Sequence, residues 1–154
     1  AQPKLTLTEH QHWRQRCRLA PDDYHRFHAP VAGTVTSLTP LGKELFSVKA
    51  CAINSRINVL CENKRVVLEV ASPAFGTVFV VAVGAAQVGS IQLTVAVGQH
   101  ISKGQELGFF KYGGSSVVLV FDSYRMSFDE DLVANSSRRV ETLVRMGTSL
   151  GKAP

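Results

Sequence analysis

Short apolar runs separated by Gly, Pro, Asn and Ser dominate the chain after Ala32. The runs are rich in β-branched and aromatic residues, which is typical of strands bounded by turns. The predicted strands cover residues 34–38, 45–50, 58–60, 66–70, 78–83, 91–95, 107–112 and 117–121. Many short strands with frequent turns predict a mainly β fold, built as a barrel or a sandwich.

The two ends of the chain follow other patterns. Residues 1–18 are polar and basic, and we expect a loop or a short element that needs a partner. Between Asp129 and Gly147, apolar residues recur near helical spacing, and Gly147 is a plausible stop for one long helix. The polar run 135–137 can instead cap a shorter C-terminal helix that begins near Arg138. We favour the shorter helix.

Composition narrows the class of protein. A chain of 154 residues with 45% apolar and 19% charged residues fits one folded domain and argues against disorder. The net charge of +5 suits anionic lipid or nucleic acid, or simply a basic soluble domain. RNA-stacking and zinc-finger patterns are absent, so we expect no nucleic-acid partner and no metal.

Other bulk features concern the compartment. Cys17, Cys51 and Cys61 form no CxxC pair, and their odd number argues against a disulfide framework, which indicates a reducing compartment. Apolar runs are too short for a membrane-spanning helix. The start, Ala1-Gln2-Pro3-Lys4, has neither an initiator Met nor a signal-peptide core, which indicates a fragment or a processed chain.

The sequence Gly113-Gly114-Ser115-Ser116 lies between the last two predicted strands and carries candidate chemistry. A serine hydroxyl there can attack the carbonyl of Gly114, which has no Cβ to block the approach. Elimination and hydrolysis would then leave a pyruvoyl group, a ketone, at position 115. The same four residues are also typical of an ordinary turn.

A second cluster, Asp23-Tyr24-His25-Arg26-Phe27-His28-Ala29-Pro30, supplies candidate bases. Histidine takes up and releases protons near neutral pH, and a nucleophilic serine needs such a base. Each histidine alone also fits a surface or turn role. Both together with a Gly-Ser site favour catalysis.

Two segments resemble biotinyl and lipoyl carrier domains: 28–35 and 97–108. Those domains carry a cofactor lysine on an exposed hairpin tip. Here the second segment leads to Lys111-Tyr112-Gly113-Gly114 instead of such a tip. We therefore expect a related β architecture, a barrel-like sandwich of the biotinyl/lipoyl hybrid type, without a swinging arm.

The ordered blocks of this chain resemble the phosphatidylserine decarboxylase family. The matching blocks are DYHRFHAPVAGTV at 23–35, LFSVKACAI at 45–53, ENKRVVLEV at 62–70, VAVGAAQVGSI at 81–91 and GQELGFFKYGGSSVVLVF at 104–121. The match runs from about Arg18 to Gly151. The tail at 128–151 resembles the extramitochondrial, endomembrane branch, which implies a Golgi, endosomal, vacuolar or endoplasmic-reticulum membrane rather than a mitochondrial inner or bacterial one.

The resemblance implies roles for particular residues. Gly114–Ser115 would be the self-cleavage bond, giving a β chain of residues 1–114 and an α chain of residues 115–154 that stay together as a heterodimer, with further dimerisation open. Ser115 would become the covalent pyruvoyl cofactor. His28 would activate the serine during self-cleavage, and His25 would handle the proton during decarboxylation.

The implied reaction converts phosphatidylserine to phosphatidylethanolamine and carbon dioxide at a membrane surface. The family's self-cleavage aspartate belongs to an upstream motif that these residues lack, so we expect slow or absent self-processing by this stretch alone. Asp22 and Asp23 are too close to the histidines in sequence to be assumed as substitutes. Two alternatives stay open: a pyruvoyl-dependent decarboxylase of a free aromatic amino acid, and a non-catalytic lipid-binding or carrier-like β domain.

Overall fold

The computed structural model describes residues 4–8, 12–20, 22–85, 90–111 and 115–154. Its strands are β1 Lys4–Thr8, β2 His12–Leu19, β3 Arg26–His28, β4 Gly33–Leu41, β5 Arg65–Ser72, β6 Gly76–Val83, β7 Ile91–Leu93, β8 His100–Ile101, β9 Glu106–Phe110, β10 Ser115–Asp122, β11 Ser127–Phe128, β12 Thr142–Leu143 and β13 Gly151–Lys152. Its helices are α1 Ala50–Ile53, α2 Val59–Glu62 and α3 Glu130–Ser137.

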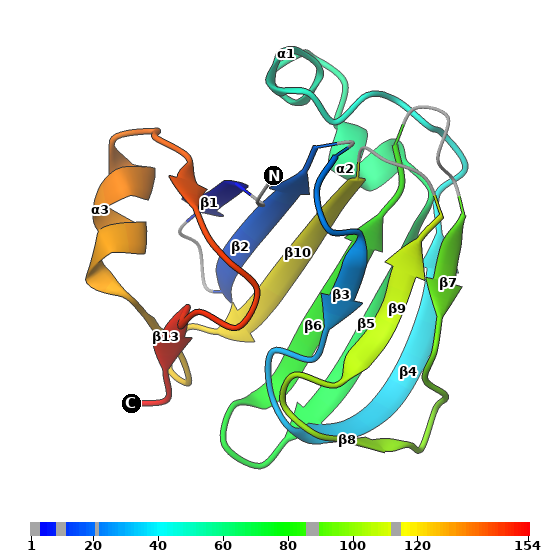
Figure 1. Cartoon of the computed structure of the whole chain (residues 1–154), viewed down its shortest axis with the longest axis vertical. Coiled ribbons are helices and arrows are strands. Elements are labelled where there is room, and N and C mark those ends of the chain that lie inside the picture. Colours follow the sequence, from blue (N-terminus) through cyan, green and yellow to red (C-terminus); the bar gives the residue numbers. More distant parts are fainter. Residues whose placement is uncertain (1–3, 9–11, 21, 86–89, 112–114) are drawn as a thin grey trace.

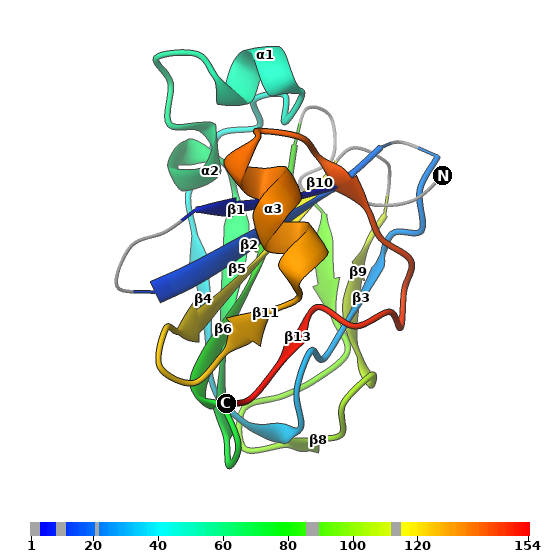
Figure 2. The same cartoon turned by 90° about the vertical axis from the view of Figure 1, so that its left-hand side faces the viewer.

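The strands form a curled antiparallel sheet faced by a smaller one (Figure 1). The large sheet has eight strands in the order β12-β1-β2-β10-β6-β5-β4-β8, and the small one has three, in the order β3-β9-β7. The pair β11–β13 forms a separate ribbon. Helices α1 and α2 lie at one end, and α3 lies beside β1 (Figure 2). The prediction of a mainly β fold is confirmed.

The core lies between the two sheets. Phe27 of β3 and Phe110 of β9 pack against each other, with ring centroids 5.3 Å apart, and belong to the same buried cluster as β10 residues. Along β10, positions 115, 117, 119 and 121 are buried and share one face, because side chains alternate along a strand. Burial of this apolar face positions the first residue of β10 at the edge of the core.

Six predicted strands are confirmed, with shifted ends: 34–38, 66–70, 78–83, 91–95, 107–112 and 117–121. Tyr112, the last residue of one of them, lies outside the described residues.

The prediction of strands at 45–50 and 58–60 is wrong. Phe46 is partly exposed, and its backbone N–H and C=O bond to the side chain of Asn63 at 2.9 and 2.8 Å, so they need no neighbouring strand. Residues 58–60 belong to the start of α2, where the Glu62 N–H donates to the Asn58 carbonyl. A short apolar run can form a strand, an irregular segment or the start of a helix. Local sequence does not decide among them, because it does not reveal a distant partner such as Asn63.

Of the two expectations for residues 1–18, the structure bears out the element that needs a partner and not the loop. Strands β1 and β2 pair with each other, and β2 pairs with β10 along its whole length. The basic side chains Arg16 and Arg18 alternate with Cys17, and both lie near the carboxylate of Glu141, at 3.8 and 3.2 Å. Pairing with β10 and contact with Glu141 therefore allow this polar segment to form an ordered strand.

The helix prediction near Arg138 is wrong in position. Helix α3 ends at Ser137, and Arg139 adopts a left-handed φ of 57°, which a helix does not continue. Leu132 anchors α3 in the interior, whereas Val140 and Leu143 are about half exposed. The helical spacing of apolar residues after 138 thus does not correspond to a packed helix face.

Candidate active site

Ser115 is the first residue of β10, and its side chain is fully buried. Its Cα lies opposite Leu19 of β2. Among the described residues, which do not include 112–114, the Ser115 hydroxyl has no hydrogen-bond partner. Leaving a buried hydroxyl unpaired costs about 1–3 kcal/mol, and such groups are rare enough to call for an explanation. The described part of the fold therefore buries this hydroxyl without giving it a hydrogen-bond partner.

His25 lies just before β3 and is half-buried. Its Nδ1 lies 2.6 Å from the carbonyl oxygen of Asp23. A carbonyl only accepts, so Nδ1 carries the proton and the lone pair of the neutral ring is on Nε2. The His25 carbonyl accepts a bond from the N–H of Phe110 at 3.0 Å, and the two rings meet edge to face. His25 is thus fixed at the end of β9, from which the chain leads on to Ser115.

His28 ends β3, and both of its ring nitrogens are engaged. Nδ1 lies 2.8 Å from the carbonyl oxygen of Gly104 and must donate to it. Nε2 lies 2.9 Å from the hydroxyl of Tyr24 and therefore accepts its proton. The two rings also stack, with centroids 5.8 Å apart. The tautomer of His28 is fixed by these partners, and the basic nitrogen is the one that Tyr24 covers.

One cavity of about 560 Å³ brings these elements together. It is lined by His28 and Tyr24 from the β3 region and by Leu19 and Val117 from the large sheet. Leu19 is the residue opposite Ser115, and Val117 is the next residue on the Ser115 face. His25 does not line this cavity. The cavity is therefore bordered by His28 and by the β10 face on which Ser115 lies, but Ser115 itself is not part of the lining and its hydroxyl bonds to neither histidine.

Sequence reasoning missed two members of this arrangement. Tyr24 lies in the histidine motif, four residues before His28, and its hydroxyl could have been recognised from the sequence as a hydrogen-bond partner for the imidazole. Gly104 is 76 residues away from His28 and offered no signal, because its contribution is a backbone carbonyl. Gly114, the predicted acyl side of the cleavage bond, lies outside the described residues.

A charged contact fixes β3 on β9. Arg26 donates to both carboxylate oxygens of Glu106, at 2.8 and 2.7 Å, and its guanidinium lies over the ring of Phe109, 5.2 Å from the centroid. Because Arg26 lies between the two histidines, this ion pair helps to fix the strand that carries them.

The described part of the chain holds no metal site, membrane-spanning helix or disulfide. No three His, Cys, Asp or Glu residues come together there as a metal site. No helix in that part is long and apolar enough to cross a membrane. Cys17, Cys51 and Cys61 are free thiols, and burial raises the pKa of the Cys17 thiol to about 12.

Comparison with known proteins decides the family. The phosphatidylserine decarboxylase family model matches residues 4–152. The chain belongs to the phosphatidylserine decarboxylase family. Phosphatidylserine decarboxylase proenzyme 2 of Komagataella phaffii is 49% identical over 89% of this chain, and proenzyme 3 of Schizosaccharomyces pombe is 47% identical over 88%. The phosphatidylserine decarboxylase proenzyme of Chlamydia muridarum is 47% identical over 88% of this chain.

The match covers only part of each relative. This chain spans 14% of the Komagataella and Schizosaccharomyces proteins and 45% of the chlamydial one. The buried Ser115, the histidine motif and the cavity lined by His28, Leu19 and Val117 form the candidate site of this family member.

Proposed function

We propose that residues 1–154 form a single catalytic domain of a pyruvoyl-dependent phosphatidylserine decarboxylase. The natural-length protein cleaves its Gly114–Ser115 bond and then converts phosphatidylserine to phosphatidylethanolamine and carbon dioxide. The observation that carries this proposal is the buried, unpartnered hydroxyl of Ser115 in a chain of this family. A buried hydroxyl among apolar neighbours fits the precursor of a ketone, which needs no donated hydrogen bond. The pyruvoyl group would supply the electron sink for decarboxylation.

His28 is the proposed base for self-cleavage. Its Nδ1–H donates to the Gly104 carbonyl, which holds the ring in one orientation, so Nε2 carries the lone pair. Nε2 can take the proton of Ser115 once it is released from the Tyr24 hydroxyl.

His25 is the proposed proton donor in decarboxylation. Its Nδ1–H is committed to the Asp23 carbonyl, so a second proton would reside on Nε2 and leave from there. The Asp23 side chain, by contrast, accepts a bond from the Ala20 N–H at 2.6 Å and closes a local turn. This use of Asp23 supports the expectation that the aspartate of the self-cleavage triad lies elsewhere in the natural-length protein.

The topology supports a two-chain product that stays together. The proposed α chain, 115–154, begins with β10, which lies between β2 and β6 of the proposed β chain. Strand β12 adds a further pairing with β1. Cleavage at the start of β10 would leave these interchain ladders in place.

An exposed surface after α3 supports contact with a membrane. Its members are apolar or basic and exposed to solvent: Arg138, Arg139, Val140, Leu143, Arg145 and Met146. Apolar side chains that enter the lipid interface and cations that meet anionic headgroups suit a phosphatidylserine-bearing surface. An endomembrane compartment is proposed from the similarity of residues 128–151 to the extramitochondrial branch.

The contact between two segments supports a relation to biotinyl and lipoyl hybrid folds. Residues 28–35 and 97–108, which resemble those domains in sequence, lie side by side: Gly33 pairs with Ile101, and Thr34 pairs with His100. The Ala29 N–H also donates to the Gln105 carbonyl at 2.8 Å.

The test is the mass of the denatured natural-length protein beside its Ser115→Ala variant. We expect two fragments from the parent, the smaller beginning with a blocked residue 115, and one intact chain from the variant. The cleaved parent is then assayed with phosphatidylserine and with free aromatic amino acids, which separates the lipid enzyme from its soluble-substrate alternative. An intact chain in both samples contradicts the proposal and favours a non-catalytic lipid-binding or carrier-like domain.

A further inference from the structure

Residues 41–57, where β4 ends and the connection to β5 begins, expose large apolar side chains to solvent. The exposed fractions are 42% for Leu41, 39% for Leu45, 36% for Phe46 and 45% for Ile57. The same connection buries Val48 and Val59 against Ala85 in a small core of its own. The exposed side chains remain outside this core, and we refer to them, with the cations among them, as the 41–57 surface.

The backbone of this surface is fixed by hydrogen bonds. The Asn63 side chain accepts from the Phe46 N–H at 2.9 Å, and it donates to the carbonyls of Phe46 and Gly84, both at 2.8 Å. The Lys64 N–H donates to the Glu44 carbonyl at 2.8 Å, and the Gly84 N–H donates to the Lys64 carbonyl at 2.9 Å. Because Gly84 directly follows β6, these bonds attach the connection to the end of the large sheet. The apolar side chains are therefore exposed from a fixed backbone.

This surface lies at the end of the large sheet that carries Ser115. A row of paired residues crosses the sheet there: Ser116 of β10 pairs with Val83 of β6, Val83 pairs with Arg65 of β5, and Arg65 pairs with Leu41 of β4. Neighbouring strands are about 4.8 Å apart, so Ser116 and Leu41 are separated by about 14 Å along the sheet. Figure 1 shows α1 and α2 at the same end of the molecule as the start of β10.

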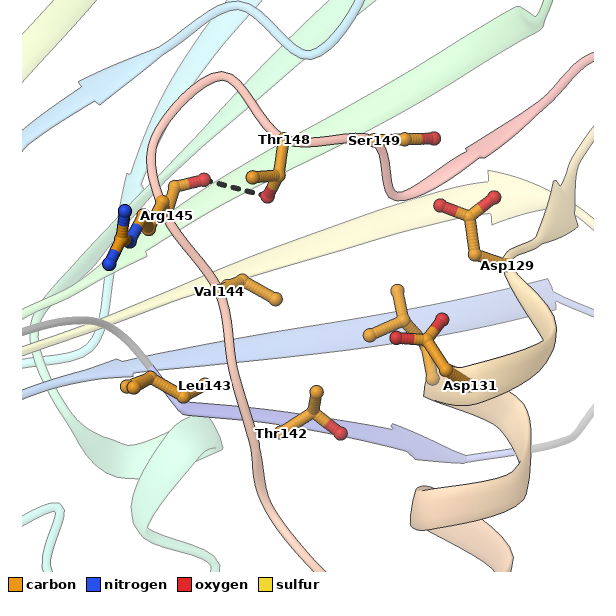
Figure 3. A pocket seen from close by; sticks show the side chains of 9 residues that line it. Asp129, Asp131, Thr142, Leu143, Val144, Arg145, Thr148 and Ser149 are labelled. Carbon is orange, nitrogen blue, oxygen red and sulfur yellow. Dashed lines mark hydrogen bonds between the residues drawn. The ribbon is translucent and has the colours of Figure 1, made fainter.

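In the other direction, the same row reaches the exposed residues after α3. Ser116 pairs with Arg18 of β2, Arg18 pairs with Lys4 of β1, and Lys4 pairs with Leu143 of β12. Leu143 is 58% exposed. Figure 3 shows Leu143 and Arg145 on the side of their segment that faces away from the acidic residues at the start of α3. Exposed apolar residues therefore lie on both sides of β10, at one end of the sheet.

The charges of the 41–57 surface favour an anionic partner. Lys43, Lys49 and Arg56 are exposed, and none of them forms an ion pair with a described residue. Glu44, the one acidic residue in this stretch, is less exposed. Apolar side chains together with cations suit an anionic bilayer, whereas interfaces between proteins are depleted in lysine. A lipid surface is therefore the partner that this composition fits.

We propose that the 41–57 surface docks on an anionic bilayer, so that the Ser115 end of the large sheet faces the lipid. The inference rests on the proposed function for where the reaction takes place, and it adds which face of the molecule meets the membrane. The apolar side chains of the surface enter the interface, and its cations stay at the level of the headgroups.

Hydrogen–deuterium exchange measures this contact in the natural-length protein with Ser115→Ala, which keeps the chain whole. Vesicles that contain phosphatidylglycerol are compared with vesicles of phosphatidylcholine alone, because phosphatidylglycerol is anionic and has no amine to condense with a pyruvoyl ketone. We expect slower exchange of residues 42–57 on the anionic vesicles, and no change in the turn 96–99 at the other end of β4. Unchanged exchange of 42–57 overturns the proposal. Slower exchange that depends on protein concentration without vesicles assigns the surface to a second copy of the chain and also overturns it.

Two substitutions with matched controls test the side chains. Ile57→Gln and Lys49→Gln should each raise the concentration of anionic vesicles that half-protects 42–57 by about fivefold, because a half-exposed apolar side chain and a cation each contribute on that scale. Val97→Gln and Arg125→Gln remove an exposed apolar side chain and an exposed cation at the other end of the sheet, and should leave this concentration unchanged. Equal effects of the two pairs overturn the assignment. Because the protein lacks the serine and the lipid is not the substrate, the outcome is independent of whether the parent cleaves itself or decarboxylates phosphatidylserine.

Discussion

The hydroxyl of Tyr24 lies 2.9 Å from Nε2 of His28 and stacks its ring on the imidazole. Since Nδ1 donates to the Gly104 carbonyl, Tyr24 covers the lone pair that the proposed self-cleavage would use. This pairing makes Tyr24 the proposed positioning residue for His28, the base that we propose for self-cleavage.

Tyr24→Phe is expected to speed self-cleavage of the natural-length protein. Loss of one hydrogen bond worth about 1 kcal/mol makes Nε2 available roughly fivefold more often, while the stacked ring is kept. The rate is followed by mass spectrometry of samples quenched in acid. Tyr124→Phe, which alters a highly exposed tyrosine, is the matched control. A slower Tyr24→Phe variant would instead place the hydroxyl in the proton path.

Removal of the second buried hydroxyl should stabilise the protein. Ser116 is as buried as Ser115 and its hydroxyl also lacks a partner. In a Ser115→Ala background, where the chain stays whole, Ser116→Ala is expected to raise the free energy of unfolding by about 1 kcal/mol. Urea denaturation measures the change. A loss of stability would indicate that the Ser116 hydroxyl is satisfied in solution, for example by water.

Asn63→Ala should be among the more destabilising substitutions. The fully buried Asn63 side chain bonds to the backbone of Phe46 through both its oxygen and its nitrogen, and to the Gly84 carbonyl at 2.8 Å. The substitution leaves the backbone groups of Phe46 and the Gly84 carbonyl without these hydrogen bonds, and is expected to lower the free energy of unfolding by about 3 kcal/mol. Asn58→Ala, at an exposed position that makes no capping bond, should change it by less than about 0.5 kcal/mol.

The two cleaved chains should separate only after denaturation. Because β10 is hydrogen-bonded on both sides, to β2 and to β6, native mass spectrometry of cleaved protein should give one particle containing both chains. The same sample in denaturant should give two. Two separate species under native conditions would contradict the central place of β10 in the sheet.

Cys17 should resist thiol reagents that modify Cys51 and Cys61. Burial raises its pKa to about 12, so very little thiolate is present at pH 8, whereas the other two thiols are exposed. The raised pKa also means that the folded state favours the neutral thiol. Its contribution to stability is therefore complete below pH 9 and is lost between pH 9 and 12. Denaturation of Cys17→Ser across this range should show a weaker fall with pH than the parent.

Several strands of the large sheet were predictable because their own sequences have the composition and boundaries that are typical of strands. The apolar runs that form β5, β6 and β10 are β-branched and bounded by turn residues, so local pattern and tertiary packing agree. The segments 45–50 and 58–60 had similar composition, but Asn63 satisfies the backbone of one and the other enters α2. Segments that form strands and segments that do not therefore differ in their contacts in the folded protein, which the sequence does not show.

The sequence by itself determined the family, the strands β4, β5, β6 and β10 of the large sheet and the residues proposed for chemistry, because motifs and strand periodicity are local patterns that do not depend on a distant partner. The tertiary structure decided what those residues face. It buried the Ser115 hydroxyl without a partner, joined His28 to Tyr24 and to the distant Gly104 carbonyl, and ordered the polar N-terminal segment as β2 beside β10. These outcomes depend on contacts between residues far apart in the chain, and such contacts form only when the two sheets close around one core.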